Sequence, residues 1–205
     1  MGIVNVTPDS FSDDGLLGDP AIAIGHGERL AAEGAGIVDI GGESTRPGHS
    51  LIDAQTELAR VLPVITALCR QIATPISIDS WKSEVAEAAL SAGASIVNDV
   101  WGCQRDPGTA DVAARHGAPL IVMHNRDAVD PELDIVSEVL RFLERSVAIA
   151  RRAGVPQEQI VVDPGIGRFG KTAEQSLTLI ANLGRLRELG CPILLGASRK
   201  SVIGA

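Results

Sequence analysis

The chain has 205 residues, the usual length of one domain, and its 45% hydrophobic content is enough for a sizeable core. Only 2% of the residues are aromatic, so that core must be aliphatic, which suits buried parallel strands. The net charge of −8 argues against binding to nucleic acid or to an anionic membrane surface. It remains compatible with a locally basic site for a small anion.

Three cysteines, Cys69, Cys103 and Cys191, are odd in number and far apart in the sequence. This spacing fits neither a disulfide framework nor a metal-binding pattern, so we expect reduced thiols in a cytoplasmic protein. No apolar run approaches the roughly 20 residues that cross a bilayer, and the first residues lack a signal-peptide pattern. We therefore expect no membrane association.

Short apolar runs alternate with helical patterns along the whole chain. The runs lie at residues 2–5, 36–40, 76–79, 95–99, 120–123, 160–163 and 193–196. Each run is brief and ends in a polar residue or glycine, as strands buried on both faces do. Between the runs, Asp19-Pro20 marks a helix start, and Thr172 with Gln175 forms a capping box ahead of a helix over 177–189.

These alternations leave few topologies, because crossovers between parallel strands are right-handed and the sheet either winds doubly or closes into a barrel. The common barrel needs eight strands and about 250 residues. This sequence ends soon after its seventh candidate strand. We predict an α/β fold of the TIM-type (β/α)8 barrel class, here incomplete with about seven βα units, in one domain over residues 1–205.

Polar side chains gather at the predicted strand ends, which face the active site in a barrel. The ends carry Asn5, Asp39, Asp79, Asn98, Met123 and Asp163, and basic residues lie just beyond several of them at Arg46, Lys171, Arg199 and Lys200. A single strand-end Asp is more often a helix cap, but so many together are hard to explain as caps. Crowded carboxylates repel unless a ligand supplies donors, which predicts a heterocycle with a guanidine-like edge that also carries an anionic group.

Four residues at or just beyond the predicted strand ends have competing structural interpretations. His124 is as compatible with packing as with catalysis, and Asp39 with loop capping as with a ligand-binding network. Glu43 is either an acid that orders a loop or a base. Lys171 is either a surface ion-pair residue or part of a basic rim.

Two long motifs, NVTPDSFSD at 5–13 and GGESTRPG at 41–48, are followed by SRK at 198–200. In this order they resemble the dihydropteroate synthase family of folate biosynthesis. The matching stretches are 2–12, 39–48, 77–80, 97–100, 122–124, 163–172 and 196–200, so the resemblance covers the whole chain. It implies an enzyme that condenses a pterin methyl diphosphate with p-aminobenzoate and releases pyrophosphate, using Mg²⁺.

The resemblance also implies a role for each matching side chain. Asp79, Asn98 and Asp163 match residues that bind the pterin edge, and Lys200 matches the lysine beside the pterin. Asn5 matches the asparagine associated with the diphosphate and the metal. We assign Asp79, Asp163 and Lys200 as catalytic, since carboxylates at this edge stabilise the pterin cation that forms as the diphosphate leaves.

The remaining substrate contacts come from loops and strand ends. Thr45, Arg46 and Pro47 match the second mobile loop of the family, and Phe11 matches the first. Ser201 matches the position near the p-aminobenzoate carboxylate, and Asp39, Met123 and Phe169 complete the predicted set. Family members are commonly homodimers and are sulfonamide targets, because sulfonamides mimic p-aminobenzoate.

The chain departs from the family pattern in three places. The first loop reads Asp13-Asp14-Gly15 where the family often has Asp-Gly-Gly. Arg168 is inserted before Phe169, which shifts that ring, and the Arg-x-His motif of the family's last strand has no counterpart before Ala205. Two other functions remain open. One is a methyltransferase acting on methyl-tetrahydrofolate, which should lack the STRPG and SRK motifs. The other is an inactive fragment that at most binds a pterin.

Overall fold

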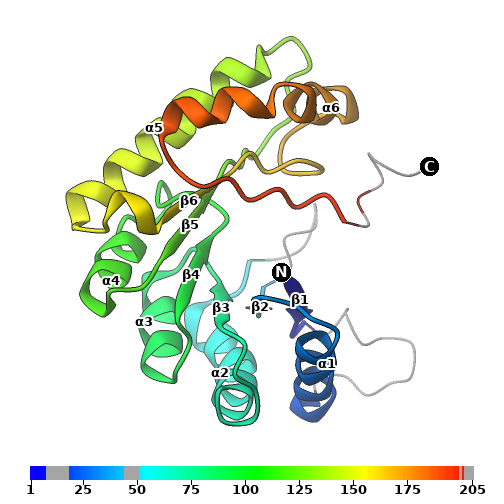
Figure 1. Ribbon diagram of the computed structural model, residues 1–205, viewed down its shortest axis with the longest axis vertical. Helices are drawn as coiled ribbons and strands as arrows, with labels where there is room; N and C mark the ends of the chain where they lie inside the picture. Colours follow the sequence, from blue (N-terminus) through cyan, green and yellow to red (C-terminus); the bar gives the residue numbers. More distant parts are fainter. Residues whose placement is uncertain (8–18, 44–50, 199, 201–205) are drawn as a thin grey trace. The chain divides into compact units, whose positions relative to one another are not determined.

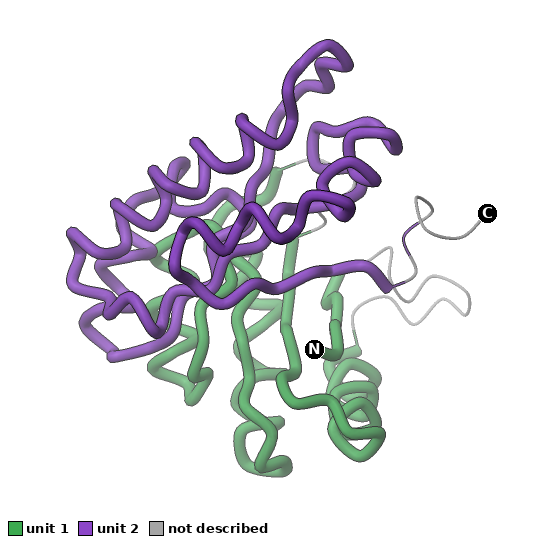
Figure 2. The backbone as a smooth tube through the Cα atoms, turned by 45° about the horizontal axis from the view of Figure 1, so that its top comes forward, with its two compact units in different colours: residues 1–98 green, residues 99–205 purple. Residues whose placement is uncertain are grey.

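The computed structural model describes residues 1–7, 19–43, 51–198 and 200. The chain divides into two compact units, Met1–Asn98 and Asp99–Ala205, which Figure 2 distinguishes by colour. In both, strands alternate with helices along the chain (Figure 1). The single domain expected from the length stays a prediction.

The first unit is built on parallel strands that pair in the order in which they occur. They are β1 (Gly2–Asn5), β2 (Val38–Gly41), β3 (Ile76–Asp79) and β4 (Ile96–Asp99). The crossovers that parallel neighbours require are α1 (Pro20–Ala32), α2 (Ala54–Gln71) and α3 (Ser83–Ser91). The predicted strands at 2–5 and 76–79 are confirmed in full, and those at 36–40 and 95–99 are confirmed with slightly different bounds.

The first unit has the aliphatic core that the composition predicts. Fully buried strand residues include Val4, Val38, Ile40 and Ile78, and α2 contributes Val61, Val64, Ile65 and Leu68. Helix α1 begins as expected, because Asp19 Oδ1 accepts a hydrogen bond from the Ala21 N–H at 2.8 Å and Pro20 occupies the first helical position.

The second unit continues the same alternation. It contains α4 (Gly108–His116), β5 (Leu120–Met123), α5 (Ile135–Ala153), the 3₁₀ helix η2 (Gln157–Gln159), β6 (Ile160–Asp163), α6 (Ala173–Ala181) and the 3₁₀ helix η3 (Leu183–Leu189). Strands β5 and β6 pair in parallel. The strand predicted at 193–196 is present only as a single parallel bridge between Val162 and Ile193, with the Leu194 N–H donating to Val162 O at 2.9 Å.

The helix predicted over 177–189 is interrupted at Asn182. The capping box of Thr172 and Gln175 is present and starts α6, as predicted. The Asn182 side chain then donates to Thr178 O at 2.9 Å, and Arg185 N bonds back to Asn182 O at 2.9 Å. This competition of an asparagine side chain for the last helical carbonyls ends the α-helix and leaves a 3₁₀ helix beyond it.

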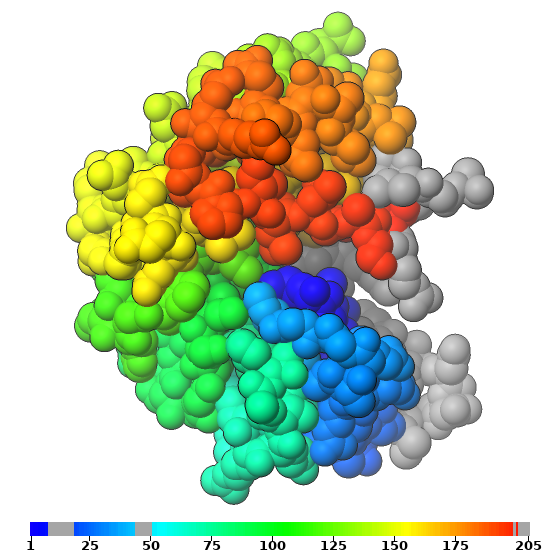
Figure 3. All heavy atoms as spheres, viewed as in Figure 1, coloured from blue at the N-terminus to red at the C-terminus, as the bar shows by residue number. Residues whose placement is uncertain are grey.

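Strand β1 lies at one end of the strand order and, within the described ranges, pairs only with β2. Ile3 is 55% exposed and Met1 42%, and the dark blue atoms of these first residues are visible at the surface in Figure 3. The six strands assigned in the described part of the chain are fewer than the eight of a closed barrel. An edge strand of this kind leaves backbone groups open to pairing.

All three cysteines are free thiols, as expected from their spacing. No helix within the described residues combines the length and the apolar character that a membrane span requires.

We predict opposite effects for two glycine substitutions in α1. A Cβ at Gly25 meets nothing within 4 Å, so Gly25→Ala should raise the free energy of unfolding by about 0.5–1 kcal/mol through reduced backbone entropy of the unfolded chain. A Cβ at Gly27 would lie 2.6 Å from Leu68 Cδ1, so Gly27→Ala should lower it by about 1–3 kcal/mol. Urea unfolding of both variants measures these changes. If both substitutions change the free energy of unfolding by the same amount, close packing of α1 on α2 does not constrain residue 27.

Candidate active site

The register of the first unit places polar side chains in one row at the strand ends. Asn5 pairs with Gly41, Gly41 with Asp79, and Asp79 with Asn98. A Cβ at Gly41 would lie 3.2 Å from Asp79 Oδ2 and 3.7 Å from Asn5 Oδ1. Glycine at residue 41 therefore keeps a side chain from crowding these two side-chain oxygens.

Asp39 lies one layer below this row and joins it to the strand interior. Its Oδ1 accepts from Ser77 Oγ at 2.5 Å and its Oδ2 from Asn98 Nδ2 at 3.1 Å. Burial raises the pKa of Asp39 to about 6, and the hydrogen bonds from Ser77 and Asn98 only partly oppose that rise. Because Asn98 Nδ2 is bound to Asp39, the side chain of Asn98 is held in one orientation, which favours the network interpretation of Asp39 over loop capping.

Asp163 ends β6 in the second unit and is also buried. Its Oδ1 accepts from the Gly165 N–H at 2.7 Å. Burial raises the pKa of Asp163, while this hydrogen bond and the nearby charges of Lys200 and Lys171 oppose the rise. Gly165 has φ +63°, and a Cβ there would lie 2.1 Å from His124 O, so only glycine fits this turn.

Lys200 and Phe169 come together beside Asp163. Lys200 Nζ donates to Ile166 O at 2.6 Å and lies 4.8 Å from the centroid of the Phe169 ring. A Cβ at Gly196 would lie 3.5 Å from Lys200 Nζ and 3.9 Å from Asp163 Oδ2, so the backbone of Gly196 passes close to both an acid and an amine. Burial lowers the pKa of Lys200, and Asp163 opposes that shift.

Lys171 is buried, so its interpretation as a surface ion-pair residue is wrong. Its Nζ donates to Phe169 O at 3.0 Å and to His124 O at 3.3 Å. These bonds hold the backbone of Phe169 in place. Burial lowers the pKa of Lys171 to about 7, although Asp163 raises it. The charge of this amine therefore changes near neutral pH.

His124 has the packing role rather than the catalytic one. It is fully buried, its ring meets Phe142 edge-on with centroids 4.7 Å apart, and neither ring nitrogen has a hydrogen-bond partner in the described part of the chain. Burial, followed by the charges of Lys171 and Arg126, lowers the pKa of His124 to about 2. The imidazole is thus neutral and too weak a base for proton abstraction at neutral pH. Met123, which ends β5, is buried beside it.

Another strand-end acid, Asp99, is a turn residue rather than a helix cap. Its carboxylate accepts from the N–H groups of Trp101 at 2.8 Å and Cys103 at 3.1 Å and from Thr109 Oγ1 at 2.7 Å, all in the following turn and helix. Burial raises its pKa to about 6. This acid stabilises its own loop.

The structure therefore groups the predicted site residues within each unit. Asn5, Asp39, Asp79 and Asn98 lie together at the strand ends of the first unit, and Met123, Asp163, Phe169 and Lys200 lie in the second. The predicted contacts Phe11, Thr45, Arg46, Pro47 and Ser201 lie outside the described residues.

The sequence analysis missed Ser77. A polar residue inside a buried strand needs a hydrogen-bond partner, and this requirement could have indicated it.

Comparison with known proteins assigns this arrangement to a family. The family model described as pterin binding enzyme matches residues 1–205. The chain belongs to the pterin-binding enzyme family. The predicted resemblance is confirmed, and within this family the chain is similar to curated dihydropteroate synthases.

The dihydropteroate synthase of Clostridium beijerinckii is 48% identical over 204 residues, which cover all of this chain and 75% of that protein. The enzyme of Bacillus subtilis is 46% identical, with 71% of its length covered. Part of each relative thus has no counterpart in this chain.

Solved structures of pterin-binding enzymes confirm the α/β barrel class. A Clostridium difficile dihydropteroate synthase determined in the presence of pteroic acid matches with a TM-score of 0.92 and 50% identity, covering all of this chain and 77% of that one. The Xanthomonas albilineans enzyme with 4-aminobenzoic acid gives 0.93 and 48%, covering all of this chain and 74% of that one. The same enzyme in complex with 7,8-dihydropteroate gives 0.88 and 45%, with the same coverage of both chains.

Removing the Ser77 hydroxyl should raise the pKa of Asp39 above about 6, because Ser77→Ala deletes a hydrogen bond that favours the carboxylate. A ¹³C titration of the aspartate carboxyl carbons measures this shift. Asp53 and Asp134 serve as internal controls, since both are helix caps whose pKa is lowered by their own N-terminal turns. An Asp39 pKa that stays unchanged or falls in the variant contradicts the role given to Ser77.

Proposed function

We propose that this chain catalyses the dihydropteroate synthase reaction, in which 6-hydroxymethyl-7,8-dihydropterin diphosphate and p-aminobenzoate give 7,8-dihydropteroate and pyrophosphate. The observation that carries the proposal is the row of Asn5, Asp79 and Asn98 at neighbouring strand ends, in a chain of the pterin-binding enzyme family. The similarity to relatives that bear this enzyme's name supports it.

In the proposed reaction, the acidic and amide side chains bind the N–H edge of the pterin. Asp79 and Asp163 accept hydrogen bonds from adjacent N–H groups, and Asn98 is oriented for this by Asp39. When the C–O bond to the diphosphate breaks, positive charge develops on the pterin, and the two carboxylates stabilise it. The aryl amine of p-aminobenzoate then forms the new C–N bond and loses a proton, so no covalent enzyme intermediate is needed.

Mg²⁺ is part of the proposal, and the residues present fit it. Asn5 Oδ1 and Asp79 Oδ2 would lie 3.7 Å and 3.2 Å from a Cβ at Gly41, and Mg²⁺ binds one or two such hard oxygen ligands together with phosphate oxygens and water. Bound there, the ion would offset the negative charge of the departing diphosphate. Lys200, beside Phe169 and Asp163, supplies a protein cation to the same substrate.

Two alternative functions are less well supported. A methyltetrahydrofolate methyltransferase would share the pterin-facing acids, but the STRPG and SRK motifs of this sequence argue against it. An inactive fragment that only binds a pterin would show binding without turnover. We also propose a cytoplasmic location, consistent with the free cysteines, and a homodimer, which the family resemblance suggests.

The direct test is to mix the chain with the pterin diphosphate, p-aminobenzoate and Mg²⁺ and to measure pyrophosphate. We expect release that depends on p-aminobenzoate and is competed by a sulfonamide. Pterin binding without pyrophosphate would support the inactive alternative and reject the proposed function.

Asp79→Ala should lower kcat/KM by about 10²-fold or more, because one of the two carboxylates that stabilise the pterin cation is lost. The matched control is Asp111→Ala, which removes an exposed acid on α4 and should leave turnover unchanged. Near-normal turnover of Asp79→Ala would reject the assignment of Asp79.

A further inference from the structure

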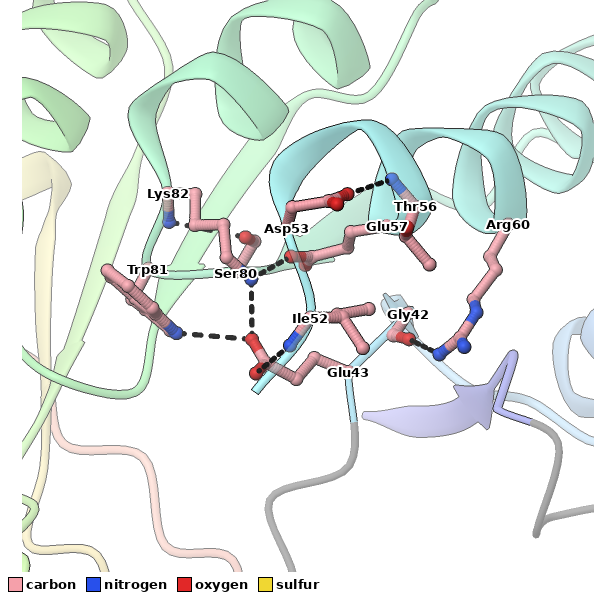
Figure 4. A network of polar contacts seen from close by, with 10 residues as sticks. All are labelled: Gly42, Glu43, Ile52, Asp53, Thr56, Glu57, Arg60, Ser80, Trp81 and Lys82. Carbon is pink, nitrogen blue, oxygen red and sulfur yellow. Dashed lines mark hydrogen bonds and ion pairs between the residues drawn. The ribbon is translucent and has the colours of Figure 1, made fainter. Parts of the chain in front are cut away.

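A buried ion cluster in the first unit joins α2 to the residues that follow β2 and β3 (Figure 4). Lys82 Nζ bridges two carboxylates, with Glu43 Oε2 at 2.6 Å and Glu57 Oε2 at 2.5 Å. The side chains of Lys82, Glu43 and Glu57 are only 11%, 8% and 1% exposed. Surface ion pairs contribute little, but removing one partner of a buried cluster leaves an uncompensated charge.

Glu43 connects this cluster to both ends of the segment 44–50. It directly precedes the segment, and its Oε1 accepts from the Ile52 N–H at 3.3 Å, just after the segment. Its Oε2 also accepts from Trp81 Nε1 at 3.3 Å. One carboxylate thus ties the backbone after the segment to the backbone before it, as Figure 4 shows.

Hydrogen bonds and close packing also hold the backbone of the residues next to Glu43 and Ile52. Arg60 on α2 donates to Gly42 O at 2.8 Å. A Cβ at Gly42 would lie 2.7 Å from Val61 Cγ1 and 3.0 Å from Glu57 Cγ, so the chain passes too close to α2 for any other residue. Asp53 Oδ1 accepts from the Thr56 N–H at 2.7 Å and begins α2 immediately after Ile52. The flanks 42–43 and 52–53 are therefore fixed to α2 and to Lys82.

The charges of the cluster are consistent with a permanent cation at its centre. Burial alone would lower the pKa of Lys82, but the hydrogen bonds from Lys82 to Glu43 and Glu57 reverse this, and its pKa is raised. Burial raises the pKa of Glu57, which Lys82 opposes. Lys82 also lies 4.9 Å from the centroid of the Trp81 ring, which adds a cation–π contact.

We propose that Lys82 is a positioning residue for the reaction: it fixes Glu43, and through Glu43 it sets the positions of both ends of the segment that carries Thr45, Arg46 and Pro47. The proposal rests on the proposed function, because the sequence resemblance gives those three residues to the substrate. Lys82 itself touches neither substrate in this scheme. A misplacement of about 1 Å in substrate-positioning residues lowers rates by about 10²-fold, so a small change at Glu43 is enough to be measured.

The test separates positioning from stability. Lys82→Met should lower kcat/KM for p-aminobenzoate by about tenfold to a hundredfold. The affinity for the pterin depends on the strand-end residues and should change less than about twofold. Lys82→Arg, which keeps the cation, should recover most of the loss. Arg141→Met, which removes an exposed ion pair with Glu138 on α5, is the control and should behave as wild type.

Two further variants keep the proposal falsifiable if Lys82→Met does not fold. Glu43→Gln retains an acceptor for the Ile52 N–H but loses the charge that Lys82 holds, so it should lower kcat/KM in the same direction. Glu57→Gln leaves the Lys82–Glu43 pair intact, so its loss of thermal stability should exceed its loss of kcat/KM. Wild-type kcat/KM in Lys82→Met or, failing that, in Glu43→Gln overturns the proposal.

Amide hydrogen exchange at Ile52 gives a readout that does not need turnover. Lys82→Met should speed exchange of this N–H by about tenfold or more, because its acceptor is no longer fixed, and exchange in the core of α5 should stay unchanged. If the wild type releases no pyrophosphate, the proposed function fails while this measurement still decides the positioning role. Unchanged exchange at Ile52 rejects it.

Discussion

Burial of carboxylates at the ends of parallel strands is the constraint on which the proposed site depends. An acid removed from water favours its protonated form, and burial raises the pKa of Asp39 and Asp163 for this reason. For Asp39 the native state therefore holds a proton between about pH 4 and 6 that the unfolded chain releases, so the contribution of Asp39 to stability falls as the pH rises through that window. A ligand whose donors meet such acids offsets part of that cost.

The parallel topology explains why the polar strand ends of the first unit gather. Strands that all run in one direction bring every carboxyl end to the same edge, and the pairing of Asn5, Gly41, Asp79 and Asn98 follows directly from that register. Glycine at residues 41 and 196 keeps a side chain from crowding the side chains of Asn5, Asp79 and Lys200. The proposed function thus depends both on polar side chains and on glycines beside them.

Much of the fold could be predicted from sequence, because buried parallel strands are short, apolar and end in polar residues or glycine. The prediction was less accurate where one side chain decided the outcome. Asn182 divides a helix whose hydrophobic pattern continues, and the strand at 193–196 is reduced to one bridge.

The strand-end acids were found from the sequence, but the residues that bind them were not. Ser77 and Lys82 act through contacts between segments far apart in sequence, which need the register to be known. Glu57 carried a weak signal, since it lies on the apolar face of α2 with Val61, Val64 and Leu68.

The central claim is that buried strand-end acids accept hydrogen bonds from a pterin. It is tested most directly by the ¹³C titration of Asp163 with and without a saturating 6-hydroxymethylpterin. We expect the pterin to lower the pKa of Asp163, because its N–H groups stabilise the carboxylate, while Asp99, whose partners lie in its own loop, keeps its value. An Asp163 pKa that is unchanged or raised by the pterin would contradict that claim.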